Sequence, residues 1–571
     1  MPHLDIGAKV GPVCIPRHCI SPHLVKFITP PLAVLKPMTD PATFSSSHPP
    51  IPLSRAIAPR LRRAMTALLS IVMAVVLGVG EAIAPLPVLA DASIQPYLDR
   101  VLDQVSEFTL DNGMQFVVME RHAAPLVSFV TYANVGGADE PDGQTGVAHF
   151  LEHLAFKGTT RIGTSNYGAE VPIMEEMSQV EVKRQRARDR GDTAEAERLR
   201  EALIALEAKA QPYVKQNEYG QIVEQAGGAG LNAATSADAT FYFYSFPSNK
   251  LELWMSLESE RFLDPVFREF YKEQDVILEE RRLRTDNSPV GTAIEAFLDA
   301  AYDVHPYKRP VIGYNQDIRN LTRLDVQDFF EKYYGPGNLT AAVVGDVDPD
   351  EVKRLAEIYF GRFPARPNPP DVIREEPTQT AEKSISIELE SQPWYFEGYH
   401  VPGLTDPDAP IYEAINRLLS SGRTSRFYKS LVEEQQIALS ASASYGFPGD
   451  RFDTLMLLYA LPAPGHDLDD IATAIHGQLD QLKNGAIAPA DLERIKTQAR
   501  ASRLRLLDSN RGMANTLAEY QAKTGDWRNL FTELDRIAAI TPEDIQRVAR
   551  KTFKSSNRTI CRLLPKTPQG S

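Results

Sequence analysis

Hydrophobic and polar positions first follow a regular period near residue 106. Between 108 and 118 the chain reads as a β-hairpin, because Asn112-Gly113 supplies a tight turn between two apolar runs. A strand is expected at 126–134 and a pair of strands at 227–244. The remaining periodic segments predict helices at 251–262, 269–298, 325–333 and 349–360, with a strand at 340–344.

Two stretches interrupt this pattern. Residues 175–209 are dense in Glu, Arg, Lys and Ala and are broken at Gly191-Asp192, which predicts a helical hairpin with charged outer faces. We interpret the region 170–217 as a solvated structural insertion. The stretch 364–380 carries five prolines and little apolar periodicity, so the best position for an inter-domain linker is 363–380.

Short motifs recur on the two sides of that linker. The segment Leu321–Gln327 (Leu-Thr-x-x-Asp-Val-Gln) returns as Ile540–Gln546, and Asn338-x-Thr340 returns as Asn557-x-Thr559, both at an offset of 219 residues. Two unrelated amphipathic helices could match by chance, but one offset across helix, loop and strand favours duplication. The expected fold is therefore α+β, with two related halves that each pack an antiparallel-rich sheet against helices. The expected boundaries of these halves are 105–362 and 381–566.

The first 92 residues read as a disordered leader followed by a signal peptide or anchor. Residues 1–60 are rich in Pro and Ser and poor in acidic residues. Arg60-Leu-Arg-Arg63, an apolar run at 67–80 and a candidate cleavage site at Val88-Leu-Ala90 or Ala90-Asp-Ala92 follow in the order of a secretory signal. Because the run is short for a membrane span, export is the better interpretation, to a bacterial periplasm, the extracellular space or an organelle lumen. An uncleaved N-terminal membrane anchor is the alternative.

Charge and cysteine content narrow the functional classes. The formal net charge is -14, which argues against general nucleic-acid binding. The cysteines are Cys14, Cys19 and Cys561, so no disulfide framework and no multi-cysteine metal site can form after residue 19. A metal site in the folded region must use histidines and carboxylates.

One segment offers such ligands. In His149-x-x-Glu152-His153 the histidines are four residues apart, about one helical turn, and Glu152 projects from the same face. Neutral imidazoles are good zinc ligands, and an unbound carboxylate beside them could accept a proton from water. This order is the inverse of the commoner His-Glu-x-x-His zinc motif. Two incidental histidines on an amphipathic helix would give the same spacing.

A third ligand is needed. Glu273 and Glu280 are seven residues apart on a helical pattern, so both lie on one face. One could bind the metal while the other hydrogen-bonds a ligating histidine. Without other information, the same pattern would describe a charged helix surface.

Taken together, these motifs resemble the pitrilysin-type M16 metallopeptidase family, the inverzincins. The resemblance covers about 106–565. It also includes Phe156-Lys-Gly-Thr159, Gly227-Gly228 with Leu231-Asn-Ala-x-Thr235, His305-Pro-Tyr307 and Pro310-Val-Ile-Gly313. It implies one zinc ion per chain. By motif, His149, His153 and Glu280 would be the ligands, Glu152 the base that activates water, and Glu273 a supporting residue; Glu279 breaks the seven-residue register and is not favoured.

The implied activity is zinc-dependent hydrolysis of extended peptides or unfolded protein segments. The strand at 231–235 would pair with substrate through backbone hydrogen bonds, with Asn232 and Ala233 as the contact residues. An ordinary edge strand is the alternative for these two residues. The rival for the whole chain is a non-catalytic structural or peptide-binding subunit.

The sequence departs from the family pattern in two places. His153 and Glu280 are 127 residues apart (280 − 153), longer than usual, and the charged insertion accounts for the excess. Val432 and Leu439 stand where family members often carry a substrate-holding Arg and Tyr. This loss suggests a heterodimer in which a related, zinc-less M16 chain supplies both groups, with a homodimer as the alternative.

Aligning the halves at Gly158 and Gly422 tests whether the second half has a site of its own. The alignment places Glu413, Asn416 and Arg417 at the positions of His149, Glu152 and His153. The second half should therefore lack a metal.

Overall fold

The computed structural model describes residues 101–369 and 374–566. The predicted leader and signal or anchor at 1–92 lie outside these ranges. Within them, no helix is both long and apolar enough to cross a bilayer.

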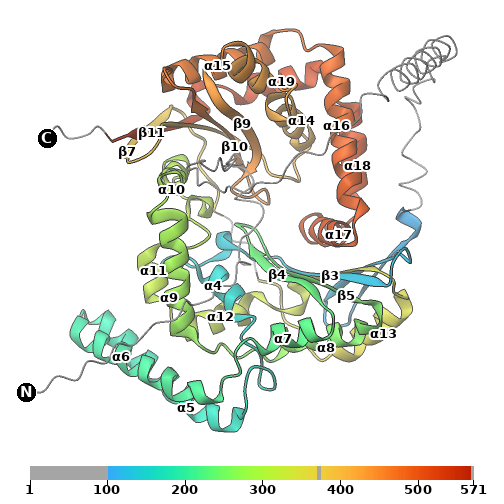
Figure 1. The fold of residues 1–571 in the computed structure, drawn as a ribbon. Coiled ribbons are helices and arrows are strands. Elements are labelled where there is room, and N and C mark those ends of the chain that lie inside the picture. The colour runs from blue at the N-terminus through green and yellow to red at the C-terminus, as the bar shows by residue number, and fades with distance from the viewer. Residues whose placement is uncertain (1–100, 370–373, 567–571) are drawn as a thin grey trace, which may run out of the picture. The chain divides into compact units, whose positions relative to one another are not determined.

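The first half is built on a mixed sheet (Figure 1), and its strands follow the order β1-β2-β6-β3-β5-β4. Neighbouring strands are antiparallel except β2 and β6, which are parallel. The strands are β1 (Val105–Thr109), β2 (Gln115–Glu120), β3 (Leu126–Ala133), β4 (Ala229–Thr235), β5 (Thr240–Pro247) and β6 (Leu339–Gly345). The main helices are α4 (Val147–Leu154), α5 (Tyr167–Asp189), α6 (Thr193–Ala210), α7 (Glu218–Gln225), α8 (Leu251–Leu263), α9 (Phe270–Arg281), α10 (Pro289–Ala301), α11 (Asn315–Asn320), α12 (Arg323–Tyr333) and α13 (Pro349–Tyr359).

The second half repeats this arrangement. Its sheet has the order β7-β11-β8-β10-β9, which matches β2-β6-β3-β5-β4 strand for strand, and β7 and β11 form the single parallel pair. The strands are β7 (Lys383–Leu389), β8 (Trp394–Val401), β9 (Ala438–Phe447), β10 (Thr454–Pro462) and β11 (Arg558–Pro565). The helices are α14 (Ala409–Ser420), α15 (Leu468–Asn484), α16 (Pro489–Asp508), α17 (Asn510–Thr524), α18 (Asn529–Ala539) and α19 (Pro542–Thr552). The predicted fold of two related halves is confirmed.

The repeated motifs have the same structural role in both halves. Thr322 is the N-cap of α12 and Thr541 is the N-cap of α19, each in a reciprocal capping box with the aspartate three residues later. The repeated asparagines also correspond. The side-chain amide of Asn338 donates to the carbonyl of Tyr333 at 2.8 Å, and that of Asn557 donates to the carbonyl of Thr552 at 3.1 Å.

Each sheet is covered on one face by a helix from the other half. Helix α10 packs on β7, β8 and β11, and α17 packs on β2, β3 and β6. At Gly398 in β8, a Cβ atom would lie 2.6 Å from the ring of Phe297 in α10, so glycine leaves the space that this ring occupies. The exchange of helices explains why β3 and β8 are buried along nearly their whole length.

Two expectations need correction. The single helix expected at 269–298 is wrong, because α9 ends at Arg281, a π-helical turn follows, and α10 starts at Pro289. Proline disfavours helical backbone at the residue before it, and the Ser288 hydroxyl caps the new helix. The charged hairpin α5–α6 forms, but α5 is not simply solvated. Its Glu170 is buried and accepts a hydrogen bond from Arg268 at 2.7 Å.

Candidate metal centre and active site

Helix α4 forms because its two faces have different chemistry. Val147, Phe150, Leu151 and Leu154 recur at helical spacing, and all four are buried in the core of the first half. His149, Glu152 and His153 occupy the opposite side of the same two turns. The helix that packs the core therefore also presents the three polar groups together.

The start of α4 is fixed by a buried carboxylate. Glu140 accepts hydrogen bonds at 2.9 Å from the backbone N–H groups of Gly146 and Ala148. Gly146 has φ +90°, a conformation that glycine adopts without strain, and it lies against Ile312 and Gly313. The ring of Phe150 stacks on Phe270 of α9 at 4.5 Å between centroids. These contacts hold α4 against α9, which carries the two glutamates.

The structure brings His149, His153 and Glu280 together. Their ligand atoms all lie within 4.8 Å of one another. The Oε2 atom of Glu280 is 3.8 Å from Nε2 of His149 and 3.5 Å from Nε2 of His153. Tetrahedral zinc with bonds of about 2.0–2.2 Å separates neighbouring ligands by about 3.3–3.6 Å, so the donor set and spacing suit this ion.

The electrostatics of the cluster also suit a cation. Burial lowers the pKa of His149 to about 3, which keeps its imidazole neutral. Burial opposes protonation of His153 too, but hydrogen bonds to Glu273 and Glu280 outweigh it and raise the pKa of His153 to about 10. The site therefore attracts positive charge, and a bound divalent cation would take the place of that proton.

Further side chains orient the ligands. Glu273 lies 3.3 Å from Nδ1 of His153, and its other oxygen accepts from Lys157 at 2.5 Å. The second oxygen of Glu280 pairs with Arg284 at 2.8 Å. Each glutamate thus directs one oxygen to a histidine and the other to a positively charged side chain. Glu279 points away, with 52% of its side chain exposed. Nδ1 of His149 is buried and has no partner among residues 101–369 and 374–566.

Glu152 stands beside this cluster without belonging to it. Its Oε2 atom accepts a hydrogen bond from the Thr235 hydroxyl at 2.5 Å. Burial raises the pKa of Glu152, while His153 and Thr235 act in the opposite direction. Thr235 ends β4, the strand at the edge of the sheet that also carries Asn232 and Ala233. The candidate base and the predicted substrate strand are therefore neighbours.

Three of these contacts were not predicted. The sequence alone assigns no role to Lys157, Thr235 or Arg284, although Thr235 is the last residue of the motif that begins at Leu231. Arg284 is four residues after Glu280, and that spacing was the available signal for its ion pair.

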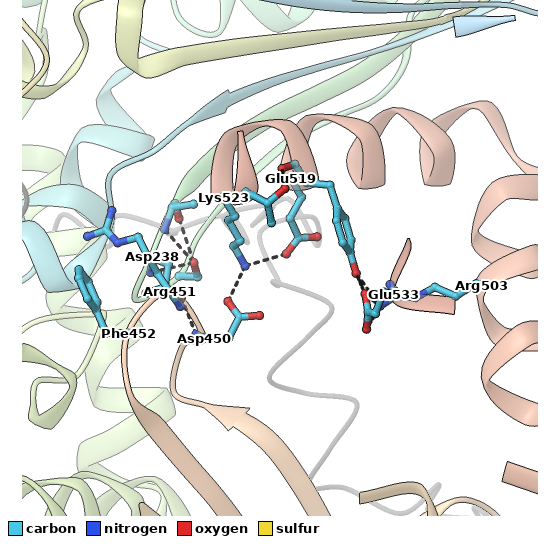
Figure 2. Close-up of polar contacts among 12 residues, drawn as sticks. Asp238, Asp450, Arg451, Phe452, Arg503, Glu519, Lys523 and Glu533 are labelled. Carbon is cyan, nitrogen blue, oxygen red and sulfur yellow. Dashed lines mark hydrogen bonds and ion pairs between the residues drawn. The ribbon is translucent and has the colours of Figure 1, made fainter. Parts of the chain in front are cut away.

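The turn after β4 connects the site to the second half. Asp238 is buried and accepts hydrogen bonds from the backbone N–H groups of Asp450 at 2.7 Å and Arg451 at 3.1 Å (Figure 2). It also accepts from the Tyr307 hydroxyl at 2.5 Å. A Cβ atom on Gly449 would lie 2.5 Å from this carboxylate, so glycine permits the close approach. Lys523 donates to Asp450 at 2.7 Å and extends the network to α17.

Replacing Asp238 by Ala is expected to lower the free energy of unfolding by about 2–5 kcal/mol, because two backbone donors and a tyrosine hydroxyl lose their acceptor. Urea unfolding followed by tryptophan fluorescence measures this change. The matched control is Asp469→Ala. The side chain of Asp469 is 74% exposed and pairs with Arg562, so this replacement should change the free energy of unfolding little. Equal stability of the two variants would contradict the role given to Asp238.

Comparison with known proteins identifies the family. The model of the insulinase domain (peptidase family M16) matches residues 116–183 and 207–314, and the model of the peptidase M16 inactive domain matches 320–499. The chain belongs to peptidase family M16. The gap between the matched segments, 184–206, falls within the charged hairpin α5–α6.

Relatives cover most of this M16 chain. The Zinc protease PqqE of Helicobacter pylori is 29% identical over 468 residues, which span 80% of this chain and 92% of the relative. The Uncharacterized zinc protease ML0855 of Mycobacterium leprae is 25% identical over 456 residues, 78% of this chain and 89% of the relative. Among solved structures, a protease from Helicobacter pylori has a TM-score of 0.68 and 27% identity, covering 81% of this chain and 99% of its own.

A second solved structure shows the fold alone. The peptidase M16 inactive domain from Pseudomonas fluorescens has a TM-score of 0.65 at 16% identity, with 82% of this chain and 99% of that chain covered.

The second half carries different groups at the corresponding positions. Glu413 and Arg417 lie one turn apart on α14 and form an ion pair at 2.7 Å. Val432 packs partly against the core of the second half, and Leu439 in β9 is 55% exposed. Neither Val432 nor Leu439 offers the charge or hydroxyl that an Arg and a Tyr would supply.

Proposed function

We propose that the protein is a zinc-dependent endopeptidase that cleaves extended peptides or unfolded protein segments. The observation that carries this proposal is the convergence of His149, His153 and Glu280 beside Glu152, which is not one of the clustered ligands. Zinc held by those three side chains would polarise the scissile carbonyl and lower the pKa of a bound water.

Glu152 is the residue that we propose transfers protons. It lies on the face of α4 that carries both histidines, and the Thr235 hydroxyl fixes one of its oxygens. As a base, the carboxylate accepts a proton from the attacking water and then passes it to the leaving amine. Glu273 and Arg284 act indirectly, since they hold His153 and Glu280 in position.

The edge strand β4 accounts for the expected substrate class. An extended peptide can add to a sheet edge through backbone hydrogen bonds, which depend little on side-chain identity. Asn232 and Ala233 lie on this edge, next to the strand end that carries Thr235. This geometry suits unfolded segments, because a folded substrate would not offer a free strand.

The active assembly is proposed to be a heterodimer with a related, zinc-less M16 chain. Support comes from Val432 and Leu439, which leave this chain without the substrate-holding Arg and Tyr of the family pattern. A homodimer that uses other substrate contacts is the alternative.

Incubation with a denatured protein tests the activity and the assembly together. Mass spectrometry of the products should detect internal cleavages that stop when a zinc chelator is added. After size-exclusion chromatography, full activity should elute with a dimer. Mass spectrometry of that fraction identifies the second chain. Full activity of the isolated monomer would reject the dimer, and no cleavage with any partner would favour a non-catalytic subunit.

A further inference from the structure

A polar cavity lies in the second half, far along the chain from the proposed zinc ligands. Its volume is about 410 Å³, within the range of small-molecule sites. It is enclosed by α14, α16, α17, α18, the end of β9 and the loop before α14. Three of its lining residues, Asp450, Arg503 and Glu533, are drawn in Figure 2.

This cavity occupies the position that corresponds to the metal cluster of the first half. Glu413 and Arg417 line it, and these are the residues that align with His149 and His153. The surrounding elements correspond as well. Helix α14 contacts β9 and α16, as α4 contacts β4 and α9. Duplication has therefore left a hollow at the same place with a different set of charges.

The carboxylates that line the cavity already have cationic partners. Glu413 pairs with Arg417, Asp450 pairs with Lys523 at 2.7 Å, and both oxygens of Glu533 accept from Arg503 at 2.9 and 3.0 Å. The Tyr520 hydroxyl also donates to Glu533. These acidic groups do not require a cation from outside.

Two guanidinium groups are left with unused donors. Arg417 binds Glu413 through Nη2, and 17% of its side chain remains exposed. Arg536, which also lines the cavity, is exposed and makes no hydrogen bond or ion pair within residues 101–369 and 374–566. The guanidinium N–H groups that these contacts leave open can donate to a ligand that supplies a negatively charged acceptor.

We propose that this cavity binds a short peptide through its free carboxylate. A carboxylate accepts hydrogen bonds from guanidinium groups at short distance, and Arg417 and Arg536 provide them. The rest of the wall offers apolar contacts from Leu404, Pro410 and Leu506 and side-chain amide and hydroxyl groups from Asn529 and Thr405. This mixture matches the aliphatic and amide groups of a peptide better than it matches an inorganic anion.

Isothermal titration calorimetry tests the proposal with metal-free protein that carries Glu152→Gln, so that no peptide is cleaved. The probe is Ala-Ala-Ala, compared with the same tripeptide amidated at its C-terminus and with glutarate. Ala-Ala-Ala should bind at one site per chain, and the amide should bind about 10- to 100-fold more weakly, as expected for loss of a charged hydrogen bond. Because binding by metal-free protein is the readout, the result does not depend on the proposed peptidase activity.

Arginine variants test whether the tripeptide binds in this cavity. Arg417→Gln and Arg536→Gln, each added to the same background, should weaken binding of Ala-Ala-Ala by about tenfold or more. Arg354→Gln, at an exposed arginine on α13, is the control and should leave it unchanged. Since Arg536 is exposed, its replacement tests the cavity even if Arg417→Gln fails to fold. Equal binding of the amide, tighter binding of glutarate, or no effect of Arg536→Gln would overturn the proposal.

Discussion

Replacing Glu152 by Gln is expected to lower kcat/KM for peptide cleavage by about 10²- to 10⁴-fold while zinc content stays at the wild-type level. Glutamine keeps the size of the side chain and can still accept the hydrogen bond from Thr235. It cannot take a proton from water. Because Glu152 lies outside the cluster of His149, His153 and Glu280, the metal should be retained.

Zinc analysis of the same preparations separates this outcome from misfolding. Glu279→Gln is a suitable control, since Glu279 is a surface glutamate on α9 whose ion-pair partner among the described residues is Arg282. Its activity and zinc content should match those of the wild type. A Glu152→Gln variant with undiminished cleavage would show that another group transfers the proton.

Replacing Glu280 by Ala is expected to abolish both zinc binding and cleavage. The change removes the only carboxylate among the three proposed ligands and leaves two imidazoles, while His153 keeps Glu273 as its partner. Zinc sites in enzymes need three protein ligands to hold the ion, so occupancy after dialysis should fall from about one per chain to near zero. Inductively coupled plasma mass spectrometry measures this directly.

Glu273→Gln provides a graded comparison for that experiment. Glu273 contacts His153 but is not itself one of the three clustered ligands, so its loss should weaken zinc affinity by about 10- to 100-fold without removing the site. Zinc affinity should therefore decrease from the wild type to Glu273→Gln and from Glu273→Gln to Glu280→Ala. Full zinc occupancy in Glu280→Ala would contradict the assigned ligand set.

Much of the site could be predicted because its determinants are local. The spacing of His149, Glu152 and His153 follows from helical geometry, and the same period relates Glu273 to Glu280. The resemblance to M16 peptidases then joined the two segments, which are far apart in the sequence. In the structure Glu280 contacts both histidines and Glu273 contacts His153, while Glu152 lies beside them and accepts a hydrogen bond from Thr235.

What could not be predicted depends on contacts between distant elements. The hydrogen bond between Thr235 and Glu152 needs β4 to lie beside α4, and no local pattern encodes that distance. The exchange of α10 and α17 between the halves likewise depends on tertiary packing. The break at Ser288-Pro289 was different, because its sequence signal was present and the apolar periodicity on either side obscured it.

A zinc titration of metal-free protein tests the proposed zinc-dependent peptidase activity most directly, with cleavage of an unfolded polypeptide as the readout and the partner chain present if one co-purifies. Activity should rise in proportion to added zinc and level off at one equivalent per chain. Cleavage by the metal-free protein, or no cleavage at one equivalent of bound zinc, would contradict it.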